Sequence, residues 1–317
     1  MCTYNGARFL LEQLESIADQ TTLPDELVIC DDQSTDESIE IIRAFASRAS
    51  FAVRIEVNKE NLGSTKNFEK AVNLCRGEII VLADQDDVWQ PQKLAVIYRT
   101  LEAHPSAGYV FSDGELINEY GVLNGRKLWE AGCLRGSFLH DFAAGRQVEV
   151  LLRWAVVTGA TMAFRSNLKT IITPFCCHFV HDYWISLLAS CLGAYGAPIS
   201  EPLIRYRLHM GQQIGVGKKS LLDKVKRGRI AAIDRKRNVL GLQDVRDRLL
   251  LAAADGRTPF ASHMHLIEEK LAHCSVRAAA HSVRGLARVR KVFSEVRTGR
   301  YGRFSNSWQS IVEDLYF

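Results

Sequence analysis

The pattern of apolar and polar positions in the first part of the chain predicts strands and helices in alternation. Short runs at Leu27–Cys30, Val53–Val57 and Ile79–Ala83 have the length and the β-branched residues of strands. Between them, apolar residues three or four positions apart predict helices over Ala7–Asp19 and Ser64–Cys75. Because strands that alternate with helices usually pair in parallel, we expect an α/β fold with a mostly parallel sheet flanked by helices.

The same pattern predicts further elements along the chain. Ser34 and Glu37 have the spacing of a capping box, which would start a helix. Gly108–Asp113 has the pattern of another strand, and Asp182–Leu192 that of a helix. From Leu221 onward, basic and apolar residues interleave at helical spacing, so we expect a helical carboxyl-terminal region.

The first six residues, Met1–Gly6, have the pattern of the end of a strand and its turn. A parallel sheet of this kind uses strands of about five residues. We therefore expect the first strand to be incomplete, through truncation or a misplaced start, and the stability of the fold to be lowered.

Composition is that of an ordinary globular protein. Of 317 residues, 47% are apolar and 24% charged, and no apolar run reaches the roughly 18 residues of a transmembrane helix. No cleavable signal peptide is visible, and the eight cysteines form no CxxC pair. These features favour a reducing, cytoplasmic location, with peripheral contact at the inner face of the cell membrane left open.

Charge divides the chain into two regions. Residues 218–317 contain 21 basic and 10 acidic residues, whereas residues 1–217 contain 19 basic and 26 acidic residues. The change falls at Gly215–Gly217 and predicts a first domain over 1–217 and a helical basic region over 218–317. The basic segments near residues 218–237 have three interpretations: a solvated helical face, attraction to anionic phospholipid, or nucleic-acid binding, which no motif supports.

Acidic residues follow two of the predicted strands. The strand at Ile79–Ala83 ends in Asp84, Asp86 and Asp87, and an earlier strand ends in Asp31–Asp32. Carboxylates this close repel one another unless a cation lies among them, and open α/β sheets bind ligands at the carboxyl ends of their strands. The cluster therefore predicts a divalent metal site. The alternative for each motif is an acidic turn between a strand and a helix.

Six motifs, in this order and spacing, resemble family 2 glycosyltransferases with the nucleotide-diphospho-sugar transferase (GT-A) fold. They are Cys2–Gly6, Asp31–Asp36, Asn61–Gly63, Asp84–Asp87, His181–Trp184 and Arg207–His209. The stretches Asp84–Trp89 and Lys66–Glu69 are similar to the bacterial rhamnosyltransferase-like branch. The resemblance covers roughly residues 1–215 and departs from the family at the first strand, which is largely absent.

The resemblance implies a set of residues that bind the nucleotide of the donor. Asp32 matches the aspartate that binds the base, and Tyr4 can stack on a pyrimidine ring. Thr3 and Asn5 would contact the nucleotide through the turn that they form. Lys66 would reach a phosphate, or would be an exposed, solvated helix lysine.

It also implies that Mg²⁺ or Mn²⁺ neutralises the leaving diphosphate. Asp86 is the expected direct ligand, and Asp84 would help through the ribose or a water molecule. His209 falls where some family members supply a further metal or phosphate contact, although a lone histidine is more often an ordinary polar residue.

On the acceptor side, Asp182 matches the general base of the family, which would take the proton of the acceptor hydroxyl and give inversion. Thr158, Gly159 and Trp184 are the expected acceptor-side residues, and glycine would allow close backbone approach. The alternative places Asp182 at a helix start for its effect on the helix dipole, with Trp184 in the core.

The sequence thus predicts an inverting glycosyltransferase that moves a sugar, with rhamnose from dTDP-rhamnose as one candidate, to a glycan or lipid-linked acceptor in bacterial cell-envelope polysaccharide synthesis. Two other interpretations are a nucleotidyltransferase, whose Gly-rich basic loop Tyr4–Arg8 matches poorly, and a non-catalytic nucleotide-sugar binding protein.

Overall fold

The computed structural model describes residues 1–132, 136–212, 221–256 and 261–316, with side chains described from residue 235 onward in the helix that starts at Leu221. A small parallel sheet is formed by strands in the order β1-β2-β3. These strands are β1 (Cys2–Thr3), β2 (Glu26–Asp31) and β3 (Ala52–Val57). Cys2 pairs with Cys30 and Thr3 with Asp31, so the turn after β1 lies beside the aspartates that end β2.

The remaining strands form a mixed, six-stranded sheet in the order β4-β8-β6-β9-β5, with β7 paired to β6. Its central pair, β6 and β9, is parallel, whereas β8 is antiparallel to both β4 and β6. The strands are β4 (Ile79–Val81), β5 (Val88–Trp89), β6 (Ala107–Asn118), β7 (Leu123–Lys127), β8 (Met162–Arg165) and β9 (Tyr195–Leu208). The predicted parallel pairing is therefore present in β1–β3, and antiparallel strands complete the fold.

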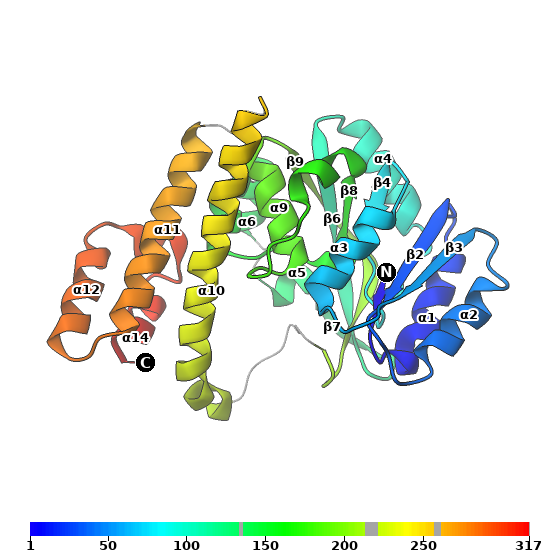
Figure 1. Ribbon diagram of the computed structural model, residues 1–317, viewed down its shortest axis with the longest axis horizontal. Helices are drawn as coiled ribbons and strands as arrows, with labels where there is room; N and C mark the ends of the chain where they lie inside the picture. The colour runs from blue at the N-terminus through cyan, green and yellow to red at the C-terminus, as the bar shows by residue number, and fades with distance from the viewer. Residues whose placement is uncertain (133–135, 213–220, 257–260, 317) are drawn as a thin grey trace.

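Helices cover the two sheets and extend the molecule on the carboxyl-terminal side (Figure 1). In the first part they are α1 (Ala7–Ala18), α2 (Ser38–Ala46), α3 (Ser64–Leu74), α4 (Lys93–Ala103), α5 (Leu128–Ala131), α6 (Ser137–Ala143), α7 (Gln147–Arg153), α8 (Lys169–Ile172) and α9 (His181–Cys191), with 3₁₀ turns η1 (Gly159–Thr161) and η2 (Ser166–Leu168). The carboxyl-terminal helices are α10 (Leu221–Ala254), α11 (Ala261–His281), α12 (Leu286–Val296), α13 (Arg300–Phe304) and α14 (Trp308–Tyr316).

One hydrophobic core joins the two regions that charge distinguishes. Leu242 and Leu249 of α10 and Ile267 of α11 are buried in the same cluster as Phe111 of β6 and Leu188 of α9. Continuous burial of this kind couples the stability of the helices to that of the sheets. The predicted boundary at 217/218 lies outside the described residues, as do Lys218, Lys219 and the side chains up to residue 234.

The elements themselves follow the predicted pattern closely. Helix α1 buries Phe9, Leu10, Leu14 and Ile17 on one face, as the spacing requires. The capping box was wrong: α2 begins at Ser38, four residues after Ser34.

Ser34 does not cap a helix because it bonds across the sheet edge instead. Its Oγ donates to Asp31 Oδ2 over 2.5 Å and accepts the backbone N–H of Asn5 over 2.9 Å. These bonds fix the turn after β1 against the end of β2.

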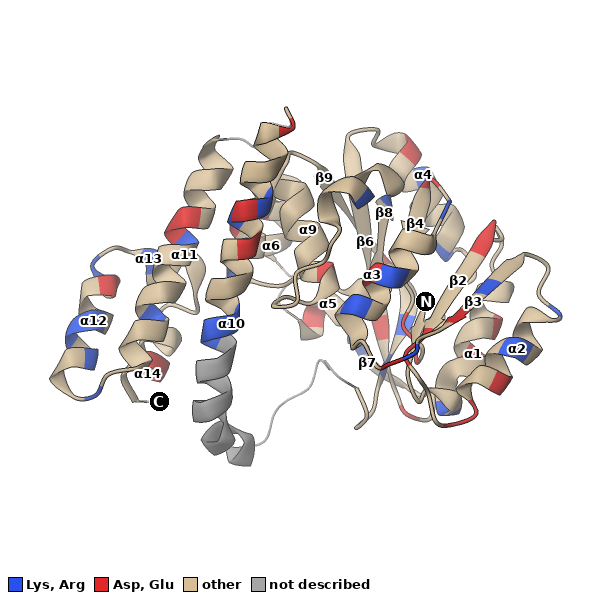
Figure 2. Cartoon of the chain, in the orientation of Figure 1, with Lys and Arg blue, Asp and Glu red and all other residues tan. Residues whose placement is uncertain are grey.

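Charged residues of the carboxyl-terminal region include lysine and arginine on α12, at the outer end of the molecule (Figure 2). Within the described ranges, no helix has both the length and the apolar composition needed to cross a bilayer.

Candidate active site

A cleft of about 280 Å³ lies where the carboxyl ends of β1, β2 and β4 meet the start of α9. Residues from five of the six sequence motifs line it, although they are up to 180 positions apart in the chain. The lining includes Thr3, Tyr4, Asp32, Asn61, Gly63, Asp84, Asp86, Thr158, Gly159, His181 and Asp182. The fold therefore gathers most of the predicted site residues around one space.

Asp32 holds the loop on one side of the cleft. Its Oδ1 accepts the backbone N–H of Leu62 over 2.8 Å, and its Oδ2 accepts that of Gly63 over 2.8 Å. Asn58 Nδ2 donates to Oδ1 over 2.7 Å. Gly63 has a φ of +76°, which a side chain would strain, so glycine suits this turn. The carboxylate keeps free acceptor capacity on Oδ2.

Tyr4 stands at the mouth of the same cleft, with 46% of its surface exposed. Its backbone is clamped by Gln85, whose Oε1 accepts the Tyr4 N–H over 2.8 Å and whose Nε2 donates to the Tyr4 carbonyl over 3.1 Å. Gln85 thereby ties the turn after β1 to the acidic loop after β4 and leaves the Tyr4 ring open for stacking.

In the acidic loop after β4, carboxyl groups are buried close to one another, which opposes their ionisation. Burial, together with the nearby carboxylates of Asp86 and Asp182, raises the pKa of Asp84 from 3.8 to about 7. Asp86 Oδ2 lies 2.8 Å from His209 Nε2. Asp84, Asp86 and Asp182 thus line one small cleft, and His209 bonds Asp86 from beside it.

This donor set fits a hard divalent cation that also binds a diphosphate. Among the described residues, no three His, Cys, Asp or Glu side chains are gathered closely enough to hold a metal by themselves. Asp86 and His209 would supply two protein ligands, and diphosphate oxygens suit the remaining positions. A cation here would also relieve the repulsion that raises the pKa of Asp84.

Two buried basic side chains lie next to the acidic loop, and one of them, Arg207, bonds to it. Arg207 donates from its backbone N–H to Asp87 Oδ1 over 3.1 Å, from Nε to the Asp86 carbonyl over 2.8 Å, and from Nη2 to Glu12 over 2.5 Å. Lys93 donates to the Ala160 carbonyl over 2.8 Å, and burial lowers its pKa to about 7.

Asp182 lies at the first turn of α9 with both carboxylate oxygens held. Oδ2 accepts the backbone N–H of Gly159 over 2.8 Å, and Oδ1 accepts that of Tyr183 over 2.6 Å. A Cβ at Gly159 would come within 2.8 Å of His181 Nε2 and 3.4 Å of Asp182 Oδ2. Glycine is therefore required for the backbone to approach this carboxylate.

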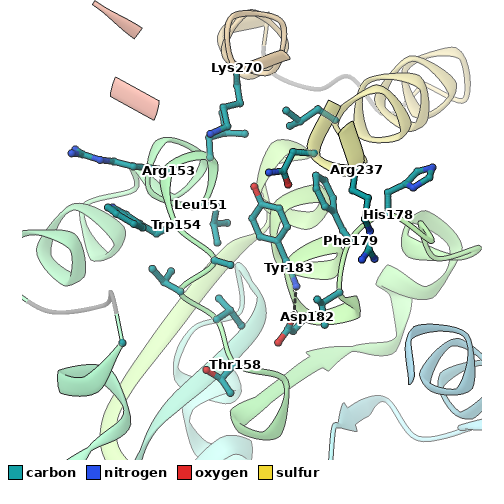
Figure 3. A pocket seen from close by; sticks show the side chains of 18 of the residues that line it. Leu151, Arg153, Trp154, Thr158, His178, Phe179, Asp182, Tyr183, Arg237 and Lys270 are labelled. Carbon is teal, nitrogen blue, oxygen red and sulfur yellow. Dashed lines mark hydrogen bonds between the residues drawn. The ribbon is translucent and has the colours of Figure 1, made fainter. Parts of the chain in front are cut away.

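A second cavity, of about 600 Å³, opens on the other side of Asp182. The two spaces share Thr158, Val180, Asp182 and Tyr206 on their linings. Figure 3 shows Asp182 and Thr158 at one end of this cavity and Lys270, from α11, at the other.

The walls of the larger cavity combine aromatic and basic side chains. Phe179 and Tyr183 pack edge to face, with ring centroids 4.8 Å apart, along one side. Arg237 of α10 reaches the cavity, and its guanidinium has no hydrogen-bond or ion-pair partner among the described residues. The helices beyond residue 220 therefore complete a cavity that begins in the first region.

Four of the predicted site residues do not line the cleft: Asn5, Lys66, Trp184 and His209. Lys66 does not line the cleft, because its Nζ bonds Glu69 over 2.6 Å and the Phe175 carbonyl over 2.8 Å. Asn5 faces the turn, where its Oδ1 accepts the Thr35 N–H over 2.8 Å. Trp184 is 1% exposed in the core and donates to the Ile172 carbonyl, so it does not reach an acceptor.

Three residues of the site were not assigned a role from the sequence. Gln85 lies within the Asp84–Asp87 motif, but its bonds to the Tyr4 backbone form only in the fold. The fold also places Lys93 beside Asp84 and Asp87. His181 lines the cleft and stacks on Phe68 with ring centroids 3.9 Å apart, and burial lowers its pKa, so it stays neutral. The His-Asp pairing in the motif was the available signal for His181.

Comparison with known proteins finds similarity over the first part of the chain. The model for "Glycosyl transferase family 2" matches residues 1–131. An uncharacterized protein of Mycobacterium tuberculosis is 34% identical over 122 residues, which are 38% of this chain and 35% of that protein. The putative glycosyltransferase EpsE of Bacillus subtilis is 31% identical over 128 residues, 40% of this chain and 46% of that protein.

Among solved structures, residues 1–349 of S. aureus TarS in complex with UDP-GlcNAc superpose with a TM-score of 0.57. The superposition covers 100% of this chain and 91% of that chain at 16% sequence identity, which shows a shared fold. The chain thus spans less than half the length of the two curated relatives but nearly all of this structure.

Proposed function

We propose that this chain, whose residues 1–131 match the model for glycosyltransferase family 2, transfers a sugar from a nucleotide-diphospho-sugar to an acceptor hydroxyl with inversion. The observation that carries the proposal is the position of Asp182. Its carboxylate lies on the wall shared by the acidic cleft and the larger cavity, so one group faces both reactants.

The donor would bind in the acidic cleft. The exposed ring of Tyr4 offers a stacking surface for the base, and Asp32 offers a carboxylate oxygen to its imide N–H. Asp84 lies deeper, beside Asp86, and its carboxyl group would form a hydrogen bond with a ribose hydroxyl of the donor. Thr3 supports this side indirectly, since its Oγ1 donates to Asp31 Oδ2 over 2.8 Å.

Departure of the diphosphate requires its charge to be neutralised. A bound Mg²⁺ or Mn²⁺ ion would supply Lewis-acid stabilisation of the leaving group. Asp86 and His209 are the residues that would hold it, and Arg207 keeps Asp86 in place through its backbone carbonyl.

The acceptor would occupy the larger cavity with its hydroxyl directed at Asp182. The hydroxyl oxygen forms a bond to the anomeric carbon, the carbon–oxygen bond to the diphosphate breaks, and its electron pair leaves with the diphosphate. Asp182 takes the hydroxyl proton. Its hydrogen bonds from the backbone N–H groups of Gly159 and Tyr183 hold the carboxylate in one orientation.

The chemical identity of the two substrates is the finer part of the proposal. The resemblance of Asp84–Trp89 to the rhamnosyltransferase-like branch makes dTDP-rhamnose one candidate donor, and the aromatic and basic cavity suits a glycan or lipid-linked acceptor of the bacterial cell envelope. The relatives described above carry no rhamnosyltransferase description, so UDP-, GDP- and dTDP-sugars should be compared by thermal stabilisation with and without Mn²⁺.

Replacement of Asp182 by asparagine is the direct test. Asparagine keeps the size of the side chain and can accept the Gly159 N–H, but it cannot take a proton. We expect kcat to fall by about 10³-fold or more, with donor affinity within about threefold of the unsubstituted chain.

Two outcomes would reject the assignment. Turnover by Asp182→Asn at the unsubstituted rate would remove Asp182 from the mechanism. Donor binding without any turnover by the unsubstituted chain, across the donor panel and a set of glycan acceptors, would favour a nucleotide-sugar binding protein instead.

A further inference from the structure

Two adjacent carboxyl-terminal helices expose large apolar side chains to solvent. On α12, Leu286 is 77% exposed and Phe293 54% exposed. On α14, which packs against α12, Trp308 and Tyr316 are 68% and 76% exposed, with Val312 between them. Exposed apolar residues that repeat every three or four positions on a helix form a stripe, not a scatter of single residues.

The outward face of α12 alternates these apolar residues with arginine. Leu286, Arg290 and Phe293 are three or four positions apart, so they lie along one side of the helix. Arg297, the residue that follows the helix, continues this side. The opposite side, with Val292 and Glu295, is buried.

Cations around this face are left without partners. Arg284, Arg290, Lys291 and Arg297 are exposed and make no side-chain hydrogen bond or ion pair within the part of the chain that the structure describes. The one acidic residue of α12, Glu295, is buried and already pairs with His273 and Arg300. Figure 2 shows the lysine and arginine positions on α12.

Hydrogen bonds connect these helices to those that line the larger cavity. Asp314 of α14 is buried and bonds Arg235, Arg277, His281 and Tyr301, which come from α10, α11 and α13. Helix α11 also carries Lys270 to the cavity. A surface that binds α12 and α14 would therefore hold the cavity at a set position.

We propose that the face formed by Leu286, Arg290, Phe293, Arg297 and, on α14, Trp308 and Tyr316 lies on the surface of an anionic phospholipid membrane. Arginine would contact lipid phosphates while leucine and phenylalanine enter the boundary of the acyl region. Tryptophan and tyrosine are the residues that favour the level of the lipid head groups.

Other occupants fit the face less well. In a symmetric pair of identical chains, Arg290 and Arg297 of one copy would lie near those of the other, which opposes association. A nucleic acid would bind the cations but would leave Leu286 and Phe293 without an apolar partner.

Binding to vesicles by the full chain tests the proposal without reference to catalysis. We expect the chain to sediment with vesicles of phosphatidylcholine and 30% phosphatidylglycerol, about tenfold or more above vesicles of phosphatidylcholine alone, and less at high salt. Arg290→Gln with Arg297→Gln should lower the partition coefficient about tenfold. Leu286→Ser with Phe293→Ser should lower it by a similar factor.

The matched control is Arg43→Gln with Lys59→Gln, which removes the same charge from exposed residues of the first region. It should bind vesicles within twofold of the unsubstituted chain. Circular dichroism melting of every variant checks that the fold is kept. Because the four substituted residues of α12 are exposed, we expect melting to be unchanged.

Three results would overturn the proposal. The first is equal binding of the α12 variants and the control. The second is no sedimentation with anionic vesicles, including the case in which duplex DNA binds instead. The third is a dimer in gel filtration that the α12 variants dissociate. The vesicle experiment does not measure donor binding or transfer. A negative result would therefore reject the membrane surface without rejecting the proposed transferase activity, and a lack of transferase activity would not reject the membrane surface.

Discussion

Asp84 is a carboxyl group whose ionisation is opposed by burial and by Asp86 and Asp182. Its pKa in the folded chain is about 7, above the unfolded value of 3.8. The proton that it retains stabilises the fold fully below about pH 4, and this contribution is lost as the pH rises through 7.

Replacement of Asp84 by asparagine removes this titration. We expect the free energy of unfolding of Asp84→Asn, relative to the unsubstituted chain, to rise by roughly 2 kcal/mol between pH 5 and pH 8.5. Urea unfolding in EDTA at the two pH values measures it.

Asp32→Asn is a suitable control, since the Asp32 carboxylate already accepts hydrogen bonds from Leu62, Gly63 and Asn58. It should not gain stability as the pH rises. An unchanged difference between Asp84→Asn and the parent at both pH values would contradict the electrostatic account of the cleft.

At this scale the sequence indicated residue types better than contacts. Asp84, Asp86 and Asp182 could be selected because they follow a predicted strand or begin a predicted helix within motifs that together resemble one family. The contact of Lys66 with the Phe175 carbonyl could not be predicted, because the two residues are far apart in the sequence.

Among the helices, α14 is anchored by one buried carboxylate in addition to its apolar packing. Asp314 bonds Arg235, Arg277, His281 and Tyr301, and these donors hold its pKa well below the usual range although burial alone would raise it. Such a group contributes stability above the unfolded pKa that is lost as the pH falls through the folded value.

Asp314→Asn should destabilise the chain at pH 7 by about 3 kcal/mol or more, because it leaves buried cations without a counter-charge. Thermal unfolding by circular dichroism measures the loss. Glu313→Gln, on the exposed side of the same helix, should change stability by less than about 0.5 kcal/mol. Equal effects of the two substitutions would mean that Asp314 is not the anchor of α14.

Helices and strands were largely predictable because their apolar spacing is local. The start of α2 was not, since Ser34 bonds Asp31 and Asn5 instead of capping a helix. The antiparallel strands of the larger sheet could not be predicted either, because the pairing of β4 with β8 joins residues far apart in the sequence. The apolar spacing within a strand does not indicate which other strand it pairs with.

For the molecule as a whole, the main feature is that the helices after residue 220 complete a cavity that faces Asp182. The sequence predicted a basic helical region, and its charge suggested a separate surface. Of its basic segment at residues 235–237, Arg235 is buried against Asp314, whereas Arg237 lines the cavity. Neighbouring residues of one charged run thus have different environments.

Arg237 and Lys236 therefore offer a matched pair for testing the cavity as the acceptor site. Both are exposed cations on α10, but Arg237 lines the cavity and Lys236 does not. For an acceptor that carries a phosphate, Arg237→Gln should raise KM for the acceptor about tenfold, because a charge-assisted hydrogen bond is lost, and should leave KM for the donor unchanged. Lys236→Gln should leave both constants unchanged.

Steady-state kinetics with phosphorylated and neutral acceptors separates the cases. An equal rise for both acceptors would show that Arg237 acts on the shape of the cavity, and an equal effect of Lys236→Gln would show that only the overall charge of α10 matters.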